Sequence, residues 1–268
     1  MRKSNSTPLY RLAARAARFA ATAMLTLASA NSAAATEFGP ATFKILSPET
    51  STLIGQVHFQ VNELADGGLT VRSNARYTNG DTDNEEDRLA APVKGGLPRQ
   101  LTFSHDFFNP DGSLDRTNKA DFVTGQATCT IYEDGQADVH SAKLDFPPDT
   151  YAGAPVVLPL RGALIGKVNL PIRFHYFTCV PSPRVVSVSA QVGTPAPWKY
   201  IEGDTVQVAI KPDFGWLNTV IAPFLPAVRA WFDPSRQWYL VGVESARYYR
   251  GPKILMVGDL APTAASSH

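Results

Sequence analysis

The sequence contains one run in which the three residue types of a serine hydrolase stand side by side, Ser104-His105-Asp106. A nucleophile and its base must lie within hydrogen-bond reach of each other. Residues 101–108 alternate between two faces as in a β-strand, and successive side chains of a strand point to opposite sides. The side chain of His105 therefore points to the opposite face of the strand from the side chains of Ser104 and Asp106. We expect no catalytic relay among the three.

The other histidines stand singly. His58, His140 and His175 each lie inside a strand-like run, and His268 is the last residue. Convergence of three of them on a metal after folding stays open, but a lone strand histidine is more often a surface residue with a backbone or water partner. The chain carries no P-loop, no dinucleotide-binding glycine pattern and no zinc-protease motif. The sequence therefore predicts no catalytic residue, no metal site and no cofactor.

Residues 79–88 carry five acidic side chains, Asp81, Asp83, Glu85, Glu86 and Asp87. Their spacing at odd positions is faintly similar to that of a calcium loop. The glycine and the terminal glutamate that such a loop requires are both missing. We therefore expect a solvated turn followed by a strand rather than an ion site.

The two cysteines, Cys129 and Cys179, both lie in strand-like runs. In an oxidising compartment such a pair favours a disulfide, which would close a loop of about 50 residues and stabilise the fold by on the order of 4 kcal/mol. The alternative is two buried thiols on separate strands.

The first 35 residues have the three parts of a secretory signal peptide. Five basic residues and no acidic one precede a 12-residue apolar run, Phe19 to Ala30, which is followed by Ala33-Ala34-Ala35. We expect cleavage after Ala35, with Ala30 as the second choice and a mitochondrial presequence as the alternative to export. The apolar run is too short for a permanent membrane helix. A periplasmic or secreted protein without a transmembrane segment is therefore predicted.

Removal of this segment leaves 24 acidic residues and all but five of the 25 basic ones, a net charge of −4. Nucleic acid is excluded as an expected partner, because binding to backbone phosphates requires a basic surface.

The stretch from Arg99 to Phe146 is the clearest structural signal. Asp-Gly turns at 111–112 and 134–135, with a third reversal at Gly125-Gln126, separate four runs of strand length. This pattern predicts a four-strand antiparallel meander. Further alternating runs cover residues 54–61, 69–77, 168–180, 184–192, 205–210, 237–249 and 253–257, and one short helical turn is expected near 160–164. We predict a mainly β domain over 36–260, a single curved antiparallel sheet forming a half-barrel or open barrel with a short helical cap, and a disordered tail at 261–268.

Residues 213–234 are apolar, aromatic and interrupted by proline, and are the least strand-like part of the mature chain. A short helix at 216–222 packed over the sheet suits them best. They either line an apolar ligand cavity or simply cap the core. The candidate ligand-binding residues are Trp216, Leu217, Val220, Ile221, Phe224 and Trp231.

The signal peptide, the long antiparallel strands with short Asp-Gly turns, and the apolar segment that can cover the open face together resemble the Lol-type lipoprotein carriers of the Gram-negative envelope. They also resemble some exported families of unknown function. The resemblance implies a half-barrel that holds an apolar ligand. No residue motif maps onto a carrier's functional positions, so no site residue is transferred.

These observations lead to two functional hypotheses from different classes, and both are favoured over a third, that the protein is a hydrolase. The first is a periplasmic, non-enzymatic protein that binds an apolar small molecule such as a lipid or acyl chain. The alternative is a structural or assembly factor of the envelope, with a filled core and an exposed edge strand that contacts a partner protein.

Overall fold

The computed structural model describes residues 38, 41–93, 96–213 and 228–260. The predicted signal peptide, the helix at 216–222 and the tail at 261–268 lie outside these residues. The strands are β1 Thr42–Leu46, β2 Leu53–Glu63, β3 Leu69–Tyr77, β4 Thr82–Leu89, β5 Gln100–Phe108, β6 Leu114–Asp121, β7 Gln126–Glu133, β8 Gln136–Lys143, β9 Thr150–Tyr151, β10 Ile172–Val180, β11 Ser182–Trp198, β12 Ile201–Pro212, β13 Val228–Asp233, β14 Tyr239–Ala246 and β15 Lys253–Gly258. The helical elements are η1 Ala154–Val156, α2 Val157–Leu164 and η4 Pro234–Arg236.

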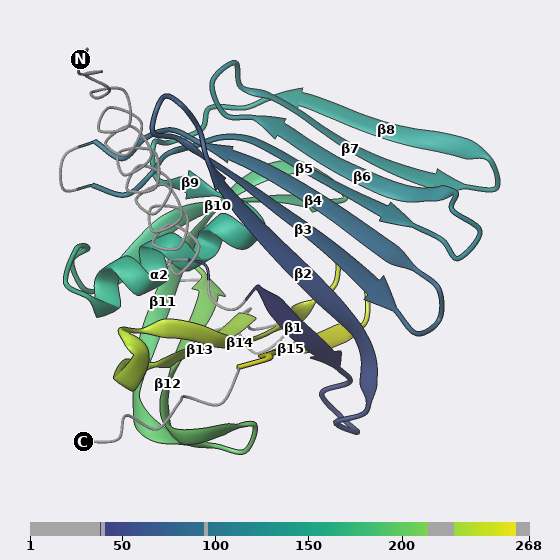
Figure 1. Ribbon diagram of the computed structural model, residues 1–268. Helices are drawn as coiled ribbons and strands as arrows, with labels where there is room; N and C mark the ends of the chain where they lie inside the picture. Colours follow the sequence, from purple (N-terminus) through teal and green to yellow (C-terminus); the bar gives the residue numbers. More distant parts are fainter. Residues whose placement is uncertain (1–37, 39–40, 94–95, 214–227, 261–268) are drawn as a thin grey trace, which may run out of the picture.

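All 15 strands belong to one sheet, in the order β8-β7-β6-β5-β4-β3-β2-β1-β15-β14-β13-β12-β11-β10-β9. Only the two-residue β9 pairs in parallel, with β10, and the other pairings are antiparallel. The sheet curls on itself without closing into a barrel (Figure 1). This confirms the predicted fold class, a mainly β, curved antiparallel sheet with one short helix.

The meander between Arg99 and Phe146 is present as predicted and forms β5 to β8. Its last turn has positive φ angles at both central residues, 51° at Asp134 and 74° at Gly135. This is the type I′ geometry that matches the twist of two adjoining strands. The turn fixes the register between β7 and β8, which pair without a shift from Glu133–Gln136 to Gln126–Lys143.

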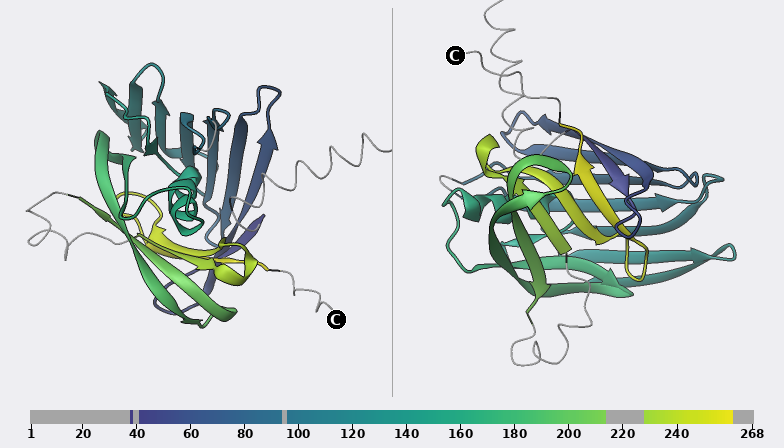
Figure 2. Two further views of the ribbon diagram at one scale, coloured as in Figure 1. Left: turned by 90° about the vertical axis from the view of Figure 1, so that its left-hand side faces the viewer. Right: turned by 90° about the horizontal axis from the view of Figure 1, so that it is seen from below.

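Helix α2 fills the hollow of the curved sheet. The left view of Figure 2 shows it inside the ring of strands. Its residues Leu158 and Leu160 are 4% and 1% exposed and belong to the main core, together with Phe43, Ile45 and Phe232 from β1 and β13. The helix is longer than the predicted turn at 160–164, and this end of the half-barrel is occupied by the protein's own side chains.

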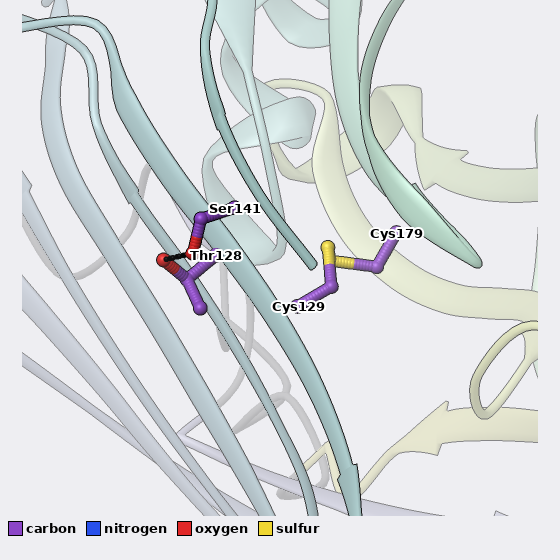
Figure 3. The surroundings of a disulfide bond; sticks show 4 residues. All are labelled: Thr128, Cys129, Ser141 and Cys179. Carbon is purple, nitrogen blue, oxygen red and sulfur yellow. Dashed lines mark hydrogen bonds between the residues drawn. A yellow bond between two sulfur atoms is a disulfide. The ribbon is translucent and has the colours of Figure 1, made fainter. Parts of the chain in front are cut away.

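The disulfide ties the two ends of the sheet together. Cys129 lies on β7 and Cys179 on β10, each one strand from an end of the sheet, and their Cα atoms are 5.8 Å apart. Figure 3 shows the bond together with the 3.1 Å hydrogen bond between Thr128 and Ser141, on the other face of the β7–β8 hairpin. The prediction of a Cys129–Cys179 disulfide is confirmed.

Strand β13 differs from the sequence-based expectation. It occupies residues 228–233, within the segment predicted to be least strand-like. Ala230 and Phe232 enter the main core, whereas Trp231 packs in a separate cluster. Because both faces of this strand are covered, its buried apolar residues Ala230, Trp231 and Phe232 are consecutive in the sequence. The alternation by which strands are recognised is therefore absent.

Candidate functional site

The inner face of β4 carries a line of carboxylates. Asp83, Glu85 and Asp87 are 5%, 9% and 0% exposed. The expected turn followed by a strand is present, with β4 beginning at Thr82. The strand turns its odd-numbered positions inward, so these three carboxylates are buried, which the sequence-based expectation did not include. The odd spacing seen in the sequence was the signal for this arrangement. Buried carboxylates need partners, and each of the three has them.

Asp83 is paired with Arg247, which follows β14 and is equally buried. The Arg247 side chain is 7% exposed and donates hydrogen bonds to Asp83 and, at 2.6 Å, to Asp81. The hydroxyl of Tyr77 donates to Asp83 at 2.9 Å, and the guanidinium lies 4.0 Å from the centre of the Tyr77 ring. This cluster joins the end of β14 to the β3–β4 turn.

Glu85 holds the chain that leads into η1 and α2. One carboxylate oxygen accepts the backbone N–H of Ala154 at 2.7 Å, and the other lies 3.2 Å from Nδ1 of His105. A Cβ atom on Gly153 would overlap this carboxylate, and Gly153 also has a φ of 55°. Glycine is therefore required at that position by space and by backbone conformation.

Asp87 is fully buried beside Glu85 on the same face. Gln100 donates to one oxygen of Asp87 at 2.7 Å and accepts the backbone N–H of Ala152 at the same distance. The second oxygen, Oδ2, has no hydrogen-bond partner among the described residues. Burial, and next the Glu85 carboxylate, raise the pKa of Asp87 well above its usual range. A protonated Asp87 gives Oδ2 a proton to donate toward Glu85, which satisfies both groups.

The acidic line therefore fastens the segment that carries the helix. Glu85 binds the backbone of Ala154, the first residue of η1, and the Asp87–Gln100 pair binds the backbone of Ala152, two residues earlier. Every oxygen of these carboxylates is committed to a contact within the protein once Asp87 is protonated. The arrangement is that of a structural network.

The histidines are separated from one another. His105 contacts Glu85, His140 contacts Asp138 at 3.1 Å, and His175 contacts Asp149 at 2.8 Å. In the part of the chain that the structure describes, no group of three His, Cys, Asp or Glu residues is placed to hold a metal ion. His58 accepts from or donates to Thr42. The partners are side chains rather than the backbone or water expected from the sequence.

Ser104 and Asp106 lie on the face opposite to the core, as the alternation predicts. They line an open hollow of about 670 Å³ over β2 to β5, which also includes Arg72 and Glu86. Arg72 donates to Glu86 at 2.8 Å, and Asp106 accepts from Thr117. The hollow lies on a sheet surface of mixed polar and apolar residues, and these charged groups are already bound by other side chains.

Strand β8 is the outermost strand on its side of the sheet (Figure 1). Each of its eight residues is exposed or half-buried, and the Val139 side chain is 55% exposed. The strand has no proline and no bulge, which are the features that usually protect an edge. Its only charged side chains are Asp138 and Lys143, with His140 between them.

The hairpin geometry decides which peptide groups of β8 are free. In a two-residue hairpin the residues flanking the turn bond to each other, and bonded positions then alternate along the strand. The N–H of Leu144 accordingly reaches the carbonyl of Gly125 at 2.8 Å. The even-numbered residues of β8 therefore face β7. The peptide groups of Ala137, Val139, Ser141 and Lys143 point away from it and meet no backbone partner within the described ranges.

Of the predicted ligand-binding residues, only Trp231 lies within the described residues. It is 8% exposed and stacks on Trp198, with ring centroids 4.6 Å apart. Both belong to an apolar cluster with Val241, Leu255 and Val257, distinct from the main core. Trp216, Leu217, Val220, Ile221 and Phe224 lie outside the described residues, so their role as a ligand wall stays a prediction.

No protein-family model matches the chain, and no curated protein matches it. Among solved structures, the chain is similar to a β-barrel-like protein of the domain of unknown function DUF1849 from Brucella abortus. The two are 15% identical, the match covers 81% of this chain and 94% of the other, and the TM-score is 0.43. The resemblance to the Lol-type carriers is not confirmed by these comparisons.

Proposed function

We propose that the chain is an exported, non-enzymatic protein of the periplasm that acts as an assembly factor of the envelope by binding a partner protein at the edge of β8. The observation that carries the proposal is the row of outward-pointing peptide groups at Ala137, Val139, Ser141 and Lys143. A strand added by a partner would satisfy these groups, as in other complexes formed by strand addition.

Two features support a scaffold held in a fixed shape. The main core fills the hollow around α2, and the disulfide ties β7, the neighbour of β8, to β10. The disulfide also accords with the oxidising compartment that the predicted signal peptide implies. No helix in the described part of the chain has the length and hydropathy to cross a membrane.

The non-enzymatic part of the proposal rests on the commitment of the buried groups. His105 is engaged by Glu85 at 3.2 Å, and its ring stacks on Phe107 with centroids 4.0 Å apart. Glu85 is also bound by the backbone of Ala154. A general base needs an acceptor aimed at the proton of a substrate, whereas Nδ1 of His105 and both oxygens of Glu85 are aimed at other protein groups.

Binding of an apolar small molecule, such as a lipid or acyl chain, is the second candidate. The stacked pair Trp198–Trp231 and the surrounding cluster favour it, because they form an aromatic surface apart from the main core. Native mass spectrometry of the purified mature chain tests this candidate. Co-purifying lipid supports it, and protein of the bare chain mass contradicts it.

The assembly function is tested by photo-cross-linking in intact cells. A photoreactive residue replaces Ser141, which lies on the edge, or Val123, which is 66% exposed in the β6–β7 turn. We expect a cross-linked protein partner from position 141 only, and loss of that product when Val139→Pro is added. Equal products from both positions, or a product that survives Val139→Pro, contradict the proposal.

A further inference from the structure

We infer that the strand added to the edge of β8 is β8 of a second copy of this chain, paired antiparallel about a two-fold axis at Val139. This rests on the proposed function, which makes β8 the binding edge, and it names the partner. The two curved sheets would then continue into each other across the axis.

The free peptide groups restrict the register. Residues of the two copies must pair through the groups that point away from β7, which belong to odd-numbered positions of β8. A two-fold axis perpendicular to the sheet keeps the core-side face of one copy next to the same face of the other. An axis at an odd-numbered residue pairs that residue with its own copy through these groups, and Ala137, Val139 and Ser141 are such choices. An axis at Asp138 or His140 also keeps the odd-numbered pairs, but it sets that side chain against the same side chain of the other copy.

Side-chain complementarity selects Val139. In this register Asp138 lies opposite the partner's His140, and His140 opposite the partner's Asp138, at the close spacing of a non-hydrogen-bonded pair. Within one chain the two side chains already share a face, with His140 Nε2 3.1 Å from Asp138 Oδ2. On the other face Val139, which is 55% exposed, meets its own copy. Both faces are thus self-complementary.

The other two registers fit less well. An axis at Ala137 brings Asp134 and Gly135 into the new ladder, and both have positive φ angles of 51° and 74° that a strand does not adopt. An axis at Ser141 places Val139 opposite the partner's Lys143 and leaves Asp138 without a basic partner. Of these registers, only the one at Val139 covers nearly the whole strand and sets the Asp138 carboxylate opposite an imidazole that can donate a hydrogen bond to it.

The regularity of β8 suits edge pairing. Six of its eight residues are exposed, and the strand keeps an unshifted register with β7 throughout. Three pairs of odd-numbered residues, centred on Val139, exchange about six backbone hydrogen bonds across the axis. Such an interface is small, and we expect a reversible dimer with a Kd in the micromolar range, about 1 to 100 μM.

Sedimentation velocity of the mature, oxidised chain across a concentration series tests the inference. We expect a monomer–dimer equilibrium that Val139→Pro weakens at least tenfold, because proline removes an N–H that points toward the partner. Val93→Pro is the matched control, since Val93 is 82% exposed in a loop, and it should leave the equilibrium unchanged. A wild-type chain that stays monomeric up to about 0.1 mM overturns the inference.

A charge exchange keeps the test valid if the proline variant fails to fold. Asp138→His alone places two histidines opposite each other and should weaken the dimer about fivefold. Addition of His140→Asp restores a carboxylate opposite each imidazole and should restore the dimer. A double variant as weak as the single one contradicts the register. A monomeric chain that still cross-links to another protein from position 141 rejects the second copy and leaves the proposed function intact.

Discussion

The inner face of β4 and the outer edge of β8 treat their polar groups in opposite ways. On β4 the carboxylates of Asp83, Glu85 and Asp87 are buried, and each is bound by another part of the chain. On β8 the peptide groups of Ala137, Val139, Ser141 and Lys143 point away from β7, the strand with which β8 pairs. The strand with the most charge, β4, has a structural role, and the weakly charged strand β8 is the one that we propose binds a partner.

This contrast shows that residue type alone is a poor guide to function in this protein. The acidic run at 81–87 suggests an ion site in the sequence, but the carboxylates of Asp83, Glu85 and Asp87 are hydrogen-bonded to other groups of the protein. The β8 strand has no cluster of charged residues, but its backbone presents a row of donors and acceptors without a backbone partner among the described residues. Substitutions in the first region should therefore affect stability, and substitutions in the second should affect association.

The largest expected effect concerns the bond that holds the β8 end of the sheet in place. Replacement of Cys129 and Cys179 by serine should lower the free energy of unfolding by about 4 kcal/mol, because the bond closes a loop with a sequence separation of 50. Urea denaturation measures this loss. Reductant should destabilise the wild-type chain and leave the double-serine variant unaffected. An unchanged midpoint in the variant shows that the bond does not constrain the sheet.

A second test removes a partner from the buried network. Arg247→Ala should lower the free energy of unfolding by about 3 kcal/mol, because it leaves Asp83 buried without its cation. Arg72→Ala is the matched control on the opposite face of the neighbouring strand, where Arg72 pairs with an exposed Glu86. Its effect on thermal unfolding should be much smaller. Equal losses from the two variants remove the contrast between the faces.

A third test uses pH. The folded pKa of Asp87 is raised by burial and by Glu85, so the stability that its protonated form contributes is fully present below the unfolded pKa of about 3.9. That contribution is lost as pH rises through the folded pKa. Asp87→Asn keeps a neutral hydrogen-bonding group, so its stability relative to the wild type should increase with pH.

Urea titrations between about pH 5 and 8 follow this difference. Asp87→Ala is the contrasting variant, because it removes the acceptor of the Gln100 hydrogen bond and should be less stable than the wild type throughout. Parallel stability curves for the wild type and Asp87→Asn rule out a proton on Asp87 in the folded chain.

The smallest effect on stability is expected at the edge. Val139→Pro should shift the midpoint of thermal unfolding of the dilute chain by little, because the N–H that it removes does not bond to β7. His140→Pro is the matched comparison, since the N–H of residue 140 faces β7, and it should destabilise the hairpin clearly. Equal shifts from the two variants contradict the assignment of bonded and free positions.

The sequence predicts the β5–β8 meander well, because Asp111-Gly112 and Asp134-Gly135 encode their turns locally. It does not predict the burial of Asp83, Glu85 and Asp87, because the partners that permit it lie elsewhere in the chain. Arg247 is far from Asp83 in sequence, and Ala152 and Ala154 approach only after the sheet has curled. Burial of a charge is decided by tertiary partners, which local periodicity cannot show.

The edge of β8 could be located from the sequence only in part. The type I′ turn at 134–135 predicts which residues face β7, but not that β8 ends the sheet. That position depends on the chain leaving through Pro147 and Pro148 to reach β9 and β10 at the other end. The strand at 228–233 was missed for a different reason, since both of its faces are covered and no alternation remains.

Residue-resolved amide hydrogen exchange along β8 tests the central claim most directly. In the dilute chain we predict slow exchange at Asp138, His140 and Ala142, whose amides face β7, and fast exchange at Ala137, Val139 and Ser141. Raising the protein concentration should slow exchange at the second set alone, as the second copy binds. Uniform protection along the strand at every concentration, or fast exchange at Val139 that no concentration slows, would contradict the account.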